Sequence, residues 1–445
     1  MTNIFVQIWR MEDLRKRVLY TLAMIAVYRL GVFIPSPGID RQILGTWFSQ
    51  QDNSLFGLYD MFSGGALKQY SVFTLGIMPY ITASIVIQLL SELVPFLKRV
   101  KDEGQAGRAR LTQYTRYFTI VIACFQSFTF ATGMEQMRVG SNLVVLDPGW
   151  AYRLLTVVTM TGGACFVMWL GEQMTERGVG NGASILIVTG IFDGIPSSLA
   201  MLYQLLQLGE VNLIQMTMLL AFMFLVVYLI VFVERGQRRI PLQYAKRVLG
   251  RRVYEGQTNY LPLKVNNSGV IPPIFASSLM MVPSTAGQFV EWSVLDWVQG
   301  AFYPGRWLYN VGYVVLVLVF AFYYTAVTFK PEDIAENLKK QGGFIPKVRP
   351  GKETAEYLDW ILNRLTTGGG VYLAVICILP TLLIVDFGVP FYFGGTSLLI
   401  IVGVSLDVVA QIEAQLSTAH YDGVAPPQGL RVRRRGQLGG AGPWV

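Results

Sequence analysis

The chain has 445 residues, of which 53% are hydrophobic and only 14% are charged, and its formal net charge is +8. Soluble domains carry about 25% charged residues, so this composition excludes an ordinary soluble enzyme, a disordered polypeptide and a coiled coil. A chain this apolar is typical of an integral membrane protein with many helical spans.

Ten apolar runs approach the roughly 20 residues that a helix needs to cross a bilayer. In chain order they are 17–36, 73–94, 113–133, 151–172, 183–203, 213–233, 268–287, 308–329, 366–385 and 393–412. The first is too long for the core of a signal peptide, and no small-residue cleavage site follows it. The sequence therefore predicts an all-α polytopic fold.

The basic residues predict the orientation of these spans. With the N-terminus in the cytosol, 30 Lys and Arg residues fall in cytosolic segments, five in outer segments, and Arg29 in the first span. Such a bias follows the positive-inside rule and places both termini in the cytosol. The basic cytosolic face suggests anionic lipid, RNA or an acidic protein surface as a partner.

The ten spans divide into two sets of five at residues 204–212. An odd number of spans per half gives the second half the opposite orientation, and such inverted repeats place the working site between the halves. We expect an N-terminal half at 1–203, a C-terminal half at 204–421 with cytosolic loops at 234–267 and 330–365, and a tail at 422–445.

Two segments near the start of a span stand out. Residues 60–68 are Gly-rich and too short to cross the membrane, so they lie on the outer surface or fill a cavity in the protein. Spans 2 and 7 carry Pro79 and the pair Pro272-Pro273 beside aliphatic residues. These prolines could loosen the helices and let both present aliphatic side chains to a common axis, or the aliphatic residues could be simple packing.

Polar residues recur in spans 2, 3 and 7. They could be helix–helix contacts or a weak seam that separates, and they are Ser84, Gln88, Gln126, Ser127, Asn267, Ser268 and Ser277. Acidic residues within the spans are few. Asp193 and Asp407 leave open a secondary transporter for a small solute, which needs an acidic ligand near the bilayer midplane. An assembly factor without a pore is a third class.

Chemistry-bearing residues are otherwise scarce. Cys124, Cys165 and Cys377 each lie in an apolar run, and His420 is the only histidine. The sequence has no Gly-x-x-x-x-Gly-Lys-[Ser/Thr] loop, and the glycines of 178–182 follow no strand, so they predict a tight turn. We expect no metal, no cofactor and no enzymatic reaction.

Ten motifs together resemble the SecY family, the large channel subunits of the bacterial preprotein translocase. The resemblance covers residues 15 to about 421, through 60–67 (DMFSGGAL), 76–80 (GIMPY), 113–117 (QYTRY), 168–182 (MWLGEQMTERGVGNG), 232–239 (FVERGQRR), 244–247 (YAKR), 261–266 (LPLKVN), 337–340 (NLKK), 349–351 (RPG) and 390–397 (PFYFGGTS).

The resemblance implies two inverted five-helix halves that form a clamshell around a central hourglass pore. It implies an aliphatic pore ring of Ile77, Ile81, Ala183, Ile187, Ile274 and Ile400. Ala183 is smaller than the family's usual residue, so it could loosen the seal locally, or Leu186 could fill its space. It also implies a plug at about 58–70, with Met61, Phe62, Ser63, Gly64, Gly65, Ala66 and Leu67.

The resemblance further implies a lateral gate between spans 2 and 3 and spans 7 and 8, where the polar seam lies. Arg251, Arg252 and Arg349 match basic positions that dock a motor or a ribosome. The implied partners are the small subunits SecE and SecG, the motor ATPase SecA, the ribosome, unfolded preproteins with their signal sequences, and lipid. The implied location is the bacterial plasma membrane, and the energy comes from the motor, the ribosome or the proton-motive force.

Overall fold

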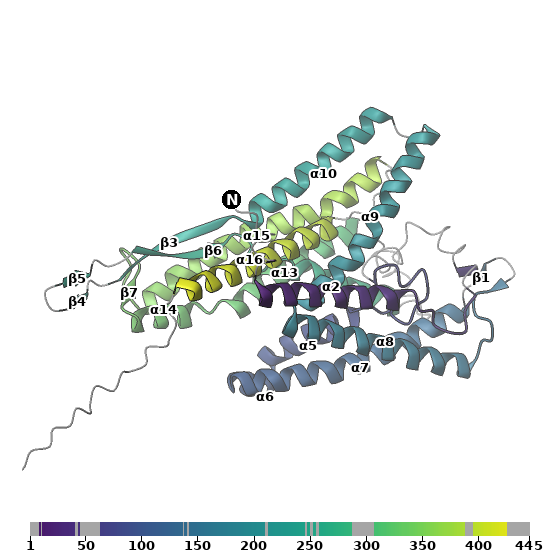
Figure 1. Cartoon of the computed structure of the whole chain (residues 1–445), viewed down its shortest axis with the longest axis horizontal. Helices are drawn as coiled ribbons and strands as arrows, with labels where there is room; N and C mark the ends of the chain where they lie inside the picture. Colours follow the sequence, from purple (N-terminus) through teal and green to yellow (C-terminus); the bar gives the residue numbers. More distant parts are fainter. Residues whose placement is uncertain are drawn as a thin grey trace, which may run out of the picture.

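The computed structural model of the chain describes residues 9, 11–40, 43–44, 63–136, 138–139, 142–209, 212–244, 247–249, 252–254, 258–286, 307–387 and 395–424. Ten long helices lie at the ten apolar runs: α2 (Glu12–Val32), α5 (Met78–Leu93), α7 (Gln105–Gln136), α8 (Trp150–Arg177), α9 (Gly182–Leu208), α10 (Leu213–Glu234), α11 (Ile271–Ala286), α13 (Trp307–Thr328), α15 (Lys352–Phe387) and α16 (Gly395–Val424) (Figure 1).

Hydropathy supports the membrane assignment for most of these helices. Within the described ranges, six are long and apolar enough to cross a membrane, and a seventh is counted if α5 and the short α6 (Pro95–Asp102) form one bent span. The polytopic helical class is confirmed, and ten crossings remain the prediction of the sequence.

The prolines lie in the first turns of their helices, so they do not interrupt a helix interior as a loosened span would require. Pro79 occupies the first turn of α5, and Pro272 and Pro273 are the second and third residues of α11. The first turn suits proline because its missing N–H would have no partner there in any case. A real bend lies at the other end of α5, where Val94 is extended before Pro95 and α6 leaves at 98°.

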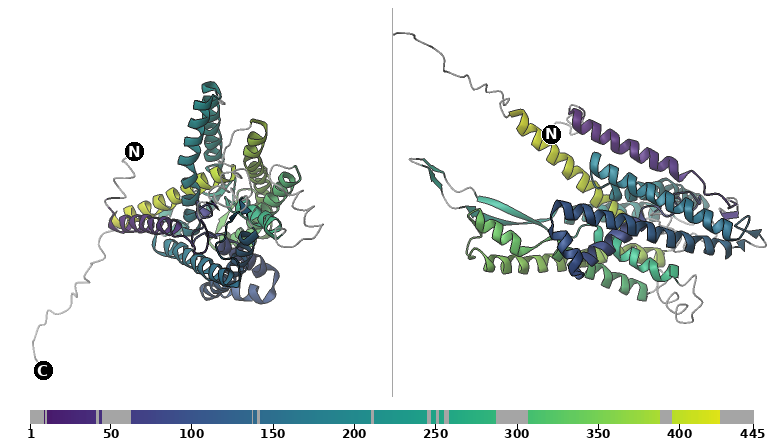
Figure 2. Two further views of the ribbon diagram at one scale, coloured as in Figure 1. Left: turned by 90° about the vertical axis from the view of Figure 1, so that its right-hand side faces the viewer. Right: turned by 90° about the horizontal axis from the view of Figure 1, so that it is seen from below.

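The helices form two groups that meet along two lines. In the first group α7 packs against α5 and α8, and α8 packs against α9; in the second, α13 packs against α11 and α15, and α16 against α15 and α10. The groups touch where α9 meets α16 and α10 and where α5 meets α11; Figure 2 shows the helices from two further sides. The main apolar core draws residues from both groups, so the center of the molecule lies between them.

Glycines allow the contact between α8, α9 and α16. A Cβ at Gly182 would lie 2.0 Å from the Gly171 carbonyl oxygen, so α8 and α9 approach too closely for any side chain there. Gly180 has φ +83° and donates its N–H to Gln411 Oε1 of α16 at 2.9 Å. The tight turn expected at 178–182 is confirmed, and it joins the two groups.

The two long polar loops fold together into one small unit at one end of the molecule (Figure 1). β3 (Gln237–Tyr244) pairs antiparallel with β6 (Thr258–Lys264) and β7 (Gly343–Phe344), and α14 (Pro331–Lys340) lies beside them. Beyond β3, the strands β4 (Arg247–Leu249) and β5 (Arg252–Tyr254) form a hairpin, while β1 (Arg138–Val139) and β2 (Asn142–Leu143) pair elsewhere.

This unit has a core of its own. The buried aliphatic residues of β3 and β6 pack with α14 and with the first turns of α15, through Ile240, Leu242, Leu263, Leu338, Ile345, Leu358, Ile361 and Leu362. The first 14 residues of α15 were expected to be loop, and they are helical because Leu358, Ile361 and Leu362 present one apolar face to this core.

Candidate functional site

Five of the six residues expected to form the pore ring belong to the main apolar cluster, and the sixth, Ala183, packs against it. Ile77, Ile81, Ile187, Ile274 and Ile400 are at most 8% exposed, and Ala183 is partly buried against them. They come from four helices or helix starts in both groups, α5, α9, α11 and α16. An aliphatic cluster fed from both groups repels water and ions and has no fixed charge that could bind a polar passenger.

Ala183 leaves the ring one small side chain. Leu186 lies in the same cluster and is 1% exposed. A Cβ at Gly171 of α8 would lie 3.2 Å from Ile77 Cδ1 and 3.6 Å from Leu186 Cδ1. Leu186 therefore packs beside Ile77 against α8.

The described part of the expected plug is buried and contributes to two apolar clusters, through Ala66 in this one and Leu67 in a second. Ser63, Ala66 and Leu67 are 0% exposed, and Ala66 belongs to the same cluster as the ring residues. The segment is a chain of turns, in which Ser71 N–H donates to the Ala66 oxygen at 3.0 Å and Thr74 Oγ1 donates to the Ser71 oxygen at 2.6 Å. Met61 and Phe62 lie outside the described residues.

The polar residues of the expected gate do not all share one place. Ser127 Oγ donates to the Ala123 oxygen at 2.7 Å and lies 3.3 Å from Thr161 Oγ1 of α8, so it faces α8 inside the first group. Ser268 Oγ donates to Asn266 Oδ1 at 2.9 Å, and Ser277 Oγ donates to the Ile274 oxygen at 2.9 Å. These three hydroxyls therefore bond within their own half.

Among the other gate residues, Gln88 has a contact across the line between the groups. Tyr323 Oη of α13 donates across that line to the Gln88 oxygen of α5 at 3.4 Å. Ser84 and Gln88 are half-buried. Gln126 Oε1 and Asn267 Nδ2 are buried without a hydrogen-bond partner among the described residues. A seam with few hydrogen bonds across it is easy to separate. The sequence did not indicate Tyr323 as one of its residues.

The small β unit carries the expected docking residues. The Arg349 side chain is 87% exposed, and its Nη1 lies 3.9 Å from Glu353 Oε1. Arg252 lies in β5, at the far end of the β ribbon, and Arg251 lies outside the described residues. A cation this exposed is free to meet a soluble partner.

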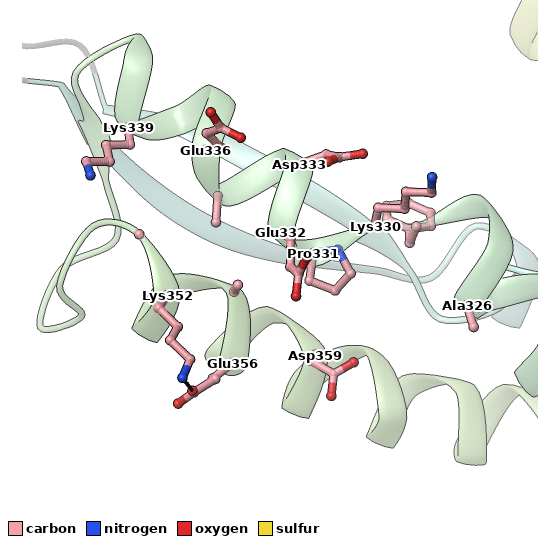
Figure 3. A pocket seen from close by; sticks show the side chains of 14 residues that line it. Ala326, Lys330, Pro331, Glu332, Asp333, Glu336, Lys339, Lys352, Glu356 and Asp359 are labelled. Atoms are coloured by element: carbon pink, nitrogen blue, oxygen red, sulfur yellow. Dashed lines mark ion pairs between the residues drawn. The ribbon is translucent and has the colours of Figure 1, made fainter. Parts of the chain in front are cut away.

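The same unit also has an acidic groove that the sequence analysis missed. It lies between α14 and α15, has a volume of about 860 Å³, and is lined by five carboxylates and three lysines: Glu332, Asp333, Glu336, Glu356, Asp359, Lys330, Lys339 and Lys352 (Figure 3). A hydrogen bond from Lys340 lowers the pKa of Glu336. The carboxylates were visible in the sequence, but only folding brings the two runs face to face.

Comparisons with known proteins agree with this geometry. The SecY family profile matches residues 71–409. The SecY translocase subunit of Escherichia coli is 44% identical over 423 residues, which cover 94% of this chain and 95% of that protein, and the subunit of Streptomyces galbus is 47% identical over 437 residues, covering 95% and 99%.

Two solved structures share the fold at low sequence identity. A SecY structure described by its plug domain, which stabilises the closed state of the translocation channel and maintains a membrane seal, has a TM-score of 0.64 at 16% identity and covers 92% of this chain and 94% of that one. Canine Sec61 in a ribosome–channel complex has a TM-score of 0.61 at 14% identity and covers 92% and 94%.

Proposed function

Because this chain belongs to the SecY family, we propose that it forms a protein-conducting channel that passes unfolded preproteins through the aliphatic cluster between its two groups of helices. The channel makes and breaks no covalent bonds. The observation that carries the proposal is the cluster itself, which contains five nearly buried isoleucines from both groups together with Ala66 of the plug.

The cluster explains how one pore can pass any sequence and still hold back ions. Aliphatic side chains exclude water when they touch each other, and they release a passing polypeptide because they offer no charge or hydrogen bond. We assign Ile77, Ile81, Ala183, Ile187, Ile274 and Ile400 to the constriction. Residues 58–70 form the plug that closes it from outside, as the plug of the SecY neighbour stabilises a closed state.

We place the sideways exit for apolar passengers between α5 and α7 on one side and α11 and α13 on the other, where α5 contacts α11. Transfer of an apolar segment into lipid is favourable by about 25 cal/mol per Å². Opposing it across the line are contacts such as Tyr323 to Gln88, and such bonds in membranes average about 0.6 kcal/mol. A signal sequence or a membrane span can therefore open this gate by its own partition energy.

The energy for transport comes from partners on the cytosolic side. The β unit with Arg349, Arg251 and Arg252 is the surface that we assign to the motor SecA and to the ribosome, and the canine neighbour is a ribosome–channel complex. SecE and SecG are the proposed small subunits, and the plasma membrane of a bacterium is the proposed location. Both termini, including the tail at 422–445, then lie in the cytosol.

The alternative, a transporter for a small solute, needs an acidic ligand withdrawn from water near the midplane. Asp193 has a side chain 50% exposed and pairs with Arg29, and Asp407 is 64% exposed and lies 3.8 Å from Lys264. Neither geometry resembles a buried ion site, so the channel is favoured.

Transport in purified vesicles tests the proposal. The complete complex in proteoliposomes, supplied with the motor and ATP, should carry an unfolded preprotein into the protease-protected lumen. Vesicles that contain an assembled complex and accumulate a small solute, but protect no preprotein, would refute the channel and favour the transporter.

A further inference from the structure

A charged pair inside the membrane-spanning part has no role in the ring, the gate or the docking surface. Arg29 of α2 and Asp193 of α9 lie 3.2 Å apart, with side chains 23% and 50% exposed. Ionisable residues within spans are costly to bury, and they mark functional positions more often than structural ones. The question is which part of the protein this pair serves.

Arg29 binds the plug as well as its carboxylate partner. Its Nη1 donates to the Gly64 oxygen at 3.2 Å and its Nη2 to the Thr189 oxygen at 2.5 Å. The preceding residue, Tyr28, donates its hydroxyl to the Ser63 oxygen at 3.0 Å. Two successive residues of α2 thus hold two successive carbonyls of the plug.

The plug backbone also lies directly on α9. Gly64 and Gly65 have φ +71° and +80°, which glycine adopts without strain. A Cβ on Gly64 would lie 2.9 Å from Gly190 Cα, and a Cβ on Gly65 would lie 2.9 Å from Asp193 Oδ2. The two glycines therefore let the plug reach the surface that carries Asp193.

We propose that Arg29 and Asp193 form a latch that holds the plug in its closed position. The inference rests on the proposed function, since it takes the plug to be the outer seal of the channel. Arg29 supplies the donors, and Asp193 orients and neutralises its guanidinium, so both are positioning residues. The planar guanidinium suits the task because it can reach three acceptors at once, which a lysine ammonium on a flexible stem does less well.

Thiol labelling of the plug tests the latch in the complete complex. The three native cysteines are replaced by alanine, Ser63→Cys is introduced at a position that is 0% exposed, and a membrane-impermeant maleimide is added from the outer side. The latch predicts slow labelling of this parent. Arg29→Gln and Asp193→Asn should each label at least tenfold faster, and Tyr28→Phe should fall between them and the parent.

Arg153→Gln is the matched control. Arg153 forms a similar pair with Glu135, 2.6 Å apart and shared between α8 and α7. The Arg153→Gln variant should be labelled as slowly as the parent. Two results would overturn the latch: assembled Arg29→Gln and Asp193→Asn complexes that label as slowly as the parent, or an Arg153→Gln complex that labels as fast as they do.

Preprotein transport is measured on the same complexes in vesicles of the opposite orientation, whose cytosolic face is turned to the motor. A parent that carries no preprotein would refute the proposed channel, whereas the labelling ratio still reports on the latch.

Discussion

A charge placed in the ring should open the resting channel to ions. Ile400 is 0% exposed and belongs to the main apolar cluster, so Ile400→Asp forces a carboxylate into the buried apolar surroundings that we propose as the constriction. A charge at the center of a span costs about 2.5 to 3.5 kcal/mol, and each 1.4 kcal/mol is tenfold in an equilibrium constant. If the wetted, open pore relieves this cost, the open fraction of the resting channel rises by about 60- to 300-fold.

Single-channel recording in planar bilayers measures this fraction, with Leu399→Asp as the matched control. Leu399 precedes Ile400 on α16 and is also 0% exposed in the same cluster, but it is not assigned to the ring. We expect Leu399→Asp to reduce the amount of assembled complex, with no added leak from the complexes that remain. Resting Ile400→Asp channels that conduct no ions, or equal ion leaks from both variants, would refute the ring assignment.

Three further predictions follow from the gate, the docking surface and the helix contact. Tyr323→Phe removes the bond to the Gln88 oxygen, so about 0.6 kcal/mol should favour gate opening about threefold and improve export of a preprotein with a weakly apolar signal; unchanged export would argue against a gate contact. Arg349→Glu should reduce motor-driven export at a normal channel level, because it reverses the charge of an exposed side chain that we assign to the docking surface, while Lys352→Glu, at an equally exposed lysine without that assignment, should matter less. Gly182→Ala should lower the folding stability by about 4 kcal/mol or more, and with it the yield of the complex, because its Cβ would lie 2.0 Å from the Gly171 oxygen. Gly162→Ala should be tolerated, because its Cβ would have nothing within 4 Å. Equal yields of the two variants would contradict the close contact.

The apolar runs predicted the helices well because a span needs only length and hydropathy. Their ends were predicted less well. The first 14 residues of α15 are polar on average, so hydropathy predicts a loop there, although Leu358, Ile361 and Leu362 repeat at helical spacing. The prolines of α5 and α11 were placed inside spans because hydropathy does not show where the first helical turn begins.

The candidate site, like the fold, could be predicted only in part from the sequence. The ring residues could be named from motif resemblance, and the structure brings five of them into one cluster, with Ala183 packed against it. The contacts of single polar residues were harder to predict. A serine such as Ser127 looks the same in the sequence whether its hydroxyl faces the seam or, as here, faces α8. The contact of Arg29 with Asp193 joins positions 164 residues apart, and nothing local in one sequence marks such a pair.

Site-specific crosslinking tests the central claim most directly. Photoreactive residues at Ile81 and Ile274, with Leu399 as the control position, are placed in the complete complex in native membranes, and a secretory chain is arrested during transport. The channel predicts adducts at Ile81 and Ile274 only while the chain is engaged, and few or none at Leu399. An engaged, partly exported chain that forms no adduct at Ile81 or Ile274 would contradict passage through this cluster.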